Sequence, residues 1–189
     1  MNDDVWYSEI LASEIELMSL LGFKSVYEAK NIRLSKEVIY NSRVVTFKDF
    51  LEIEKRKYID SIYEQVNKNE ITFDILVSLL RAITYFQGKV NFCKKYLIRT
   101  DEVEFVVSMS QELMTFAKTK FNDDDNEFSN LLDSLYTHFS RLASETSKTF
   151  INDTMNNMLY VLVYNHVPEY KAKKQTLKAY NYKGELKNG

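Results

Sequence analysis

Glycine and proline are scarce in this chain, whose 189 residues include 4 Gly and 1 Pro. Average usage would give about 13 Gly and about 9 Pro in a chain of this length. Sheet proteins need both residues for their many tight turns, and enzyme sites built from loops often need glycine. The scarcity therefore predicts an all-α fold in which long helices are joined by few irregular loops.

The residues that form common metal and redox sites are also few. Cys93 is the single cysteine, which excludes an internal disulfide, and its apolar surroundings predict a buried packing role. His138 and His166 are the only histidines, and they fall on different predicted helices. The chain has no CxxC, HExxH, GxGxxG or Walker-type motif. We therefore expect no catalytic, cofactor-binding or metal-binding residues, and a protein that is not an enzyme.

Long hydrophobic runs and a strong net charge are absent as well. The opening MNDDVWYSEI is acidic where a signal peptide would be basic, and Asp74 and Arg81 interrupt the best candidate for a membrane span. The formal net charge of -2 gives no overall attraction to nucleic acid. These features predict a soluble intracellular protein, cytoplasmic or nuclear. Abundant Tyr, Phe, Lys, Asn and Ile are typical of an AT-rich genome, such as that of a virus.

The most apolar continuous stretch runs from Thr72 to Ile98 and predicts a long central helix. Thr72 can cap its first turn, and Lys94, Lys95 and Arg99 suit its negative C-terminal end. Its apolar residues recur at steps of three or four, which places them on one helical face. They are Ile75, Leu79, Ile83, Phe86, Val90, Cys93 and Leu97, widened by Leu76, Leu80, Phe92 and Tyr96. We expect a multi-helix, mainly antiparallel bundle around this hydrophobic helix.

Caps and periodicity divide the rest of the chain into further helices. They are expected from Asp3 or Asp4 to Leu21, from Ser25 towards Asn31, in a short turn at Ser35 carrying Val38 and Ile39, from Thr46 to about Asn67, from Thr100 to Phe121, from Phe128 to Leu142, and from Phe150 to His166. We expect residues 1–168 to form the helical domain, which could divide into packed halves of about 1–87 and 100–168.

A basic Tyr/Lys tail follows the predicted helical domain. Residues 169–189 contain six lysines and two glutamates, with tyrosines interleaved among the lysines. One interpretation is a solvated chain end. The other is an arm that docks on a partner subunit or on a nucleic-acid backbone.

The helix order between Tyr58 and Phe139 resembles the Bcl-2-like fold of several viral apoptosis and signalling inhibitors. That family often carries an Asn-Trp-Gly-Arg signature at the start of its central helix. Thr72, Phe73, Asp74 and Ile75 occupy the matching positions here, so the glycine and arginine are missing. We therefore assign the chain to no family.

Two functions remain open at this stage. The first is a regulatory or structural interaction protein, a homo-oligomer that binds a protein partner through an apolar groove or patch. The alternative is sequence-independent binding of RNA or DNA, with RNA favoured, in a positively charged groove or ring of an oligomer. The candidate residues for that alternative are Lys89, Lys94, Lys95, Arg99, Lys118 and Lys120.

Overall fold

The computed structural model describes residues 5–25, 31–68, 70–121, 127–140 and 145–170, and over these ranges the chain is a multi-helix, all-α bundle with one small hairpin. The elements are α1 (Val5–Leu21), β1 (Glu37–Tyr40), β2 (Arg43–Thr46), α2 (Phe47–Lys68), α3 (Phe73–Tyr96), α4 (Thr100–Lys120), α5 (Glu127–Ser140) and α6 (Glu145–His166). The predicted caps at Asp3 and Asp4, the short helix after Ser25 and most of the basic tail lie outside the described residues.

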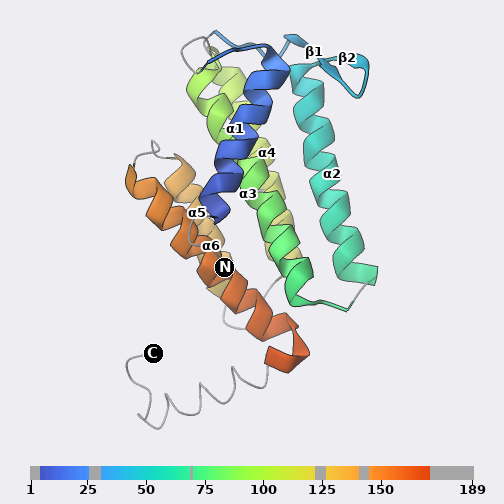
Figure 1. Ribbon diagram of the computed structural model, residues 1–189, viewed down its shortest axis with the longest axis vertical. Helices are drawn as coiled ribbons and strands as arrows, with labels where there is room; N and C mark the ends of the chain where they lie inside the picture. Colours follow the sequence, from blue (N-terminus) through green and yellow to red (C-terminus); the bar gives the residue numbers. More distant parts are fainter. Residues whose placement is uncertain (1–4, 26–30, 69, 122–126, 141–144, 171–189) are drawn as a thin grey trace.

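Helix α3 is the centre of the bundle and contacts α1, α2, α4 and α6 (Figure 1). Helices α2, α3 and α4 run antiparallel to their neighbours in sequence, as predicted. Helix α1 packs most extensively against α3. The ion pairs Glu9–Arg81 and Glu16–Lys89 show that these two helices run parallel, since the partners follow the same order along both helices. Helix α3 is continuous through the proposed boundary between two halves, and that division stays a prediction.

Burial confirms the apolar face predicted for α3. Trp6, Ile10, Leu17 and Leu21 of α1 are all buried, and so are most apolar residues of the α3 stripe. In α5, Leu132 is buried and Leu131 is half-buried. The helices of the described ranges share one continuous hydrophobic core.

Local backbone chemistry sets most helix ends. Thr46 and Thr72 accept hydrogen bonds from the amides of Asp49 and Ile75, which confirms both predicted caps. Gly22, at φ 78°, ends α1, and the following amide of Phe23 donates to the carbonyl of Met18. The predicted cap at Thr100 is wrong, because the N-cap residue of α4 is Arg99, which makes no side-chain capping bond.

A β-hairpin replaces the helical turn predicted at Ser35. Strand β1 pairs antiparallel with β2, and Val38 opposes Val45 in this register. Asn41 and Ser42 connect the strands with φ values of 51° and 62°, which match a two-residue turn with both central residues left-handed. The prediction failed because each strand has only four residues, too few for a clear alternating pattern, and because Asn-Ser is a weaker turn signal than Asn-Gly.

The thiol of Cys93 gives the first testable prediction. The side chain is buried in α3, as expected, and burial raises the pKa of the thiol well above its usual range. Because the thiolate is the reactive form, the folded protein should not react with Ellman's reagent, whereas the protein in denaturant should release one equivalent of chromophore. Rapid reaction of the folded protein would contradict this packing.

Candidate binding surface and the buried lysine beneath the hairpin

Lys89 of α3 is fully buried, although lysine normally keeps its ammonium in water. Its Nζ lies 3.0 Å from Oε2 of Glu54 on α2 and 3.2 Å from Oε1 of Glu16 on α1. The Glu54 side chain is itself buried, whereas that of Glu16 is 40% exposed. One cation therefore joins three helices, and it neutralises a carboxylate that has little access to water.

Aromatic rings complete the surroundings of the Lys89 ammonium. Its nitrogen lies 4.6 Å from the ring centre of Tyr85, 5.2 Å from that of Phe50 and 6.0 Å from that of Tyr58. Ring faces carry negative charge density, so they favour a cation that has lost its hydration shell. These rings and carboxylates surround a lysine of the chain itself, so the cluster is an internal cross-link of the bundle.

Tyr40 ties the hairpin to this buried network. Its hydroxyl donates to Oε1 of Glu54 at 3.1 Å and accepts a hydrogen bond from Nζ of Lys57 at 3.2 Å. The bond to Tyr40 and the charge of Glu54 raise the pKa of Lys57. Burial and the nearby carboxylates of Glu54 and Glu16 raise the pKa of Tyr58 far above its usual range, so its phenol stays neutral. The hairpin is thus fixed to α2 by polar contacts.

Apolar side chains gather on the side of the hairpin that faces away from Tyr40. Ile39 and Val44 are direct cross-strand partners and are 72% and 67% exposed. Ile15 of α1 is 67% exposed and lines, together with Ile39, an open depression between α1 and β1. We call Ile15, Ile39 and Val44 the hairpin face. Side chains of this size are mostly buried in folded proteins, so the hairpin face is a candidate contact surface.

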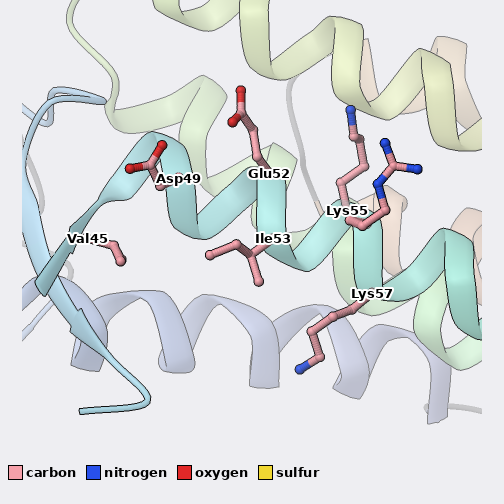
Figure 2. A pocket seen from close by; sticks show the side chains of 7 residues that line it. Val45, Asp49, Glu52, Ile53, Lys55 and Lys57 are labelled. Carbon is pink, nitrogen blue, oxygen red and sulfur yellow. The ribbon is translucent and has the colours of Figure 1, made fainter. Parts of the chain in front are cut away.

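A second open depression runs along the outer side of α2 (Figure 2). Figure 2 shows Asp49 and Glu52 on one side of α2, and Ile53 and Lys57 on the other. Val45 of the hairpin lines the same depression, which places more apolar surface beside the hairpin. The charges along α2 have mixed sign, so this depression does not select for a cation or an anion.

The residues proposed for nucleic-acid binding do not form one surface. The prediction of Lys89 as a nucleic-acid contact is wrong, because a side chain with no exposed surface cannot reach a phosphate. Lys95 pairs with Glu14 at 3.7 Å, and Arg99 pairs with Asp101 at 3.0 Å.

Lys94, Lys118 and Lys120 complete the predicted set. Lys94 is partly buried, which lowers its pKa. Lys118 pairs with Asp133, and Lys120 lies 4.4 Å from the ring centre of Tyr63. Because α3 and α4 are antiparallel, Lys94 near the end of α3 and Lys118 and Lys120 near the end of α4 lie at opposite ends of the bundle. Within one chain, the six residues do not line a shared groove.

The described ranges were also searched for metal sites and for membrane-spanning helices. Within them, no group of His, Cys, Asp and Glu side chains could hold a metal ion, and no helix is long and apolar enough to cross a membrane. Comparison of the chain with family models, curated proteins and solved structures finds no match.

Proposed function

We propose that this protein is a non-enzymatic interaction protein that binds a protein partner through the hairpin face. The observation that carries the proposal is the exposure of Ile39 and Val44 on a hairpin that Tyr40 holds in place, together with the exposed Ile15 of the adjacent helix α1. A fixed apolar surface loses little conformational freedom on binding, which favours association. Apolar side chains gain most from contact with another protein, because burial removes them from water.

The charges of the bundle support a protein partner more than a nucleic acid. Non-specific binding to a phosphate backbone needs several cations on one surface. Four of the six predicted cations already have carboxylate partners within 4 Å, namely Lys89, Lys95, Arg99 and Lys118. A phosphate would have to displace these carboxylates.

Site-specific photo-crosslinking tests the proposal. A photoreactive phenylalanine derivative placed at Ile39 should give a discrete covalent adduct with another protein molecule in the cells that naturally make this protein. Mass spectrometry of the adduct would identify the partner. The expected result is a strong adduct from position 39, because this side chain is central to the hairpin face.

Tyr160 of α6 is the matched control position, because it is 59% exposed and lies on a different element. The same photoreactive residue at position 160 should give little or no adduct. Equal adducts from the two positions, or none from position 39, would overturn the proposal. Circular dichroism of both variants would establish that each keeps its helical content.

A further inference from the structure

The register of the hairpin shows which backbone groups its two strands leave free. Tyr40 and Arg43 flank the two-residue turn, and residues in this place form a hydrogen-bonded pair. At the other end of the hairpin, the amide of Phe47 donates to the carbonyl of Lys36 at 2.7 Å. Hydrogen-bonded pairs alternate with non-hydrogen-bonded pairs along an antiparallel ladder. Both ends therefore give the same assignment, in which Val38 is also hydrogen-bonded across the hairpin.

Glu37 and Ile39 belong to the non-hydrogen-bonded pairs, so their N–H and C=O groups point away from β2, along the outer edge of β1. Within the described ranges, neither residue makes a backbone hydrogen bond outside the hairpin. Both side chains are exposed. Two donors and two acceptors therefore remain free along this edge, and an unpaired strand edge is a template for another strand.

The open depression between α1 and β1 borders this edge. Glu37 and Ile39 are among the residues of β1 that line it, and Ile15 and Leu20 are among those of α1. Ile15 is exposed and Leu20 is half-buried, so α1 offers apolar surface beside the strand. An added strand would lie about 4.8 Å from β1, and every second side chain would be on the same face as Ile39. The depression therefore provides both free backbone groups and apolar contacts.

We propose that the partner binds by strand addition, in which an extended segment of the partner protein pairs with the outer edge of β1 and places an apolar side chain at every second position on the hairpin face. This rests on the proposed function and specifies how the partner of the same surface is recognised. An extended segment fits because its own N–H and C=O groups alternate at the spacing of the edge. A helix uses these groups internally and would leave those of Glu37 and Ile39 unpaired.

Amide hydrogen exchange, measured by NMR on the full chain, tests strand addition. In the free chain, the amides of Glu37 and Ile39 should exchange rapidly, and those of Val38 and Tyr40 slowly. Saturation with the protein that position 39 crosslinks should slow exchange at Glu37 and Ile39 by about tenfold or more, because both amides become hydrogen-bonded. The amide of Val44 faces the outer edge of β2, and its rate should not change.

Backbone esters provide a second test with a matched control. Replacing Ile39 by its α-hydroxy acid analogue removes one N–H from the edge of β1 and keeps the side chain, so affinity for the crosslinked protein should fall by about fivefold. The same replacement at Val44 removes an N–H from the edge of β2 and should leave the affinity unchanged. Each ester weakens one carbonyl acceptor inside the hairpin, so the two variants differ only in the edge that they alter.

The outcomes separate strand addition from the proposed function. If position 39 gives an adduct but exchange at Glu37 and Ile39 is unchanged, or the two esters bind equally well, strand addition is overturned and the proposed function stands. Slow exchange of Glu37 and Ile39 in the free chain would also overturn it. Absence of a specific adduct from position 39 would overturn both. Slowed exchange at both amides, with weaker binding by the Ile39 ester alone, supports both.

Discussion

Replacing Lys89 with alanine is expected to lower the free energy of unfolding by about 3–5 kcal/mol. The change removes the cation that Glu54 faces at 3.0 Å, and leaves this buried carboxylate without its main partner. It also empties the space between the rings of Tyr85, Phe50 and Tyr58. Urea denaturation followed by circular dichroism would measure the loss.

Lys57 offers a matched control within the same network. It lies 3.9 Å from Glu54, but its side chain is 63% exposed, so Lys57→Ala should cost no more than about 1 kcal/mol. Combining Lys89→Met with Glu54→Gln should be less destabilising than Lys89→Ala, because the pair fills the space and removes the buried charge. Equal losses for Lys89→Ala and Lys57→Ala would contradict the role assigned to Lys89.

Gly88→Ala should lower the free energy of unfolding by about 2–3 kcal/mol through overpacking. A Cβ atom at this position would lie 1.9 Å from Oγ of Ser13 and 3.0 Å from backbone atoms of Ile10. In an exposed helix interior, the same change stabilises by about 1 kcal/mol, because alanine favours the helix. The close approach of α1 to α3 reverses that sign. Thermal or urea unfolding would measure the effect.

A double-mutant cycle with Ser13→Ala separates the clash from other effects. Removing the Ser13 hydroxyl relieves the shortest contact and leaves the 3.0 Å contacts with Ile10, so the double variant should recover part of the stability. Gly22→Ala is the control, since no atom lies within 4 Å of its added Cβ and its cost comes only from φ +78°. Gly22→Ala should therefore show no coupling to Ser13. A Gly88→Ala variant as stable as the parent would contradict the close packing of α1 and α3.

Helical periodicity was sufficient to predict the all-α class, because the spacing of apolar residues along each helix is a local property of its sequence. The same reasoning could not predict the burial of Lys89 or its ion-pair partners. Lys89 lies three residues after Phe86 and four before Cys93, within the buried stripe of α3. That position was a signal of burial, yet a lysine near a helix end is usually solvated. Its partners, Glu16 and Glu54, lie 73 and 35 residues away, and one sequence cannot show that they converge.

The hairpin face was beyond prediction for a different reason. Ile39 was assigned to a helical turn, so its pairing with Val44 and their shared exposure could not be foreseen. Two β-branched runs on either side of Asn41 were the available signal. Ile15 lies on α1 and comes near the hairpin only through the tertiary fold. Exposure of an apolar side chain depends on what the whole chain leaves uncovered.

The most direct test of the claim that the hairpin face binds another protein is a pair of methyl NMR spectra of the full chain, recorded alone and with the protein that position 39 crosslinks. Chemical shifts of the Ile15, Ile39 and Val44 methyl groups should change when this protein is added, because these groups enter an interface. Methyl groups of Val77 on α3 and Val161 on α6 belong to helices outside the hairpin face and should not change. Shifts that spare Ile39 and Val44, or that appear equally at Val77 and Val161, would contradict the claim.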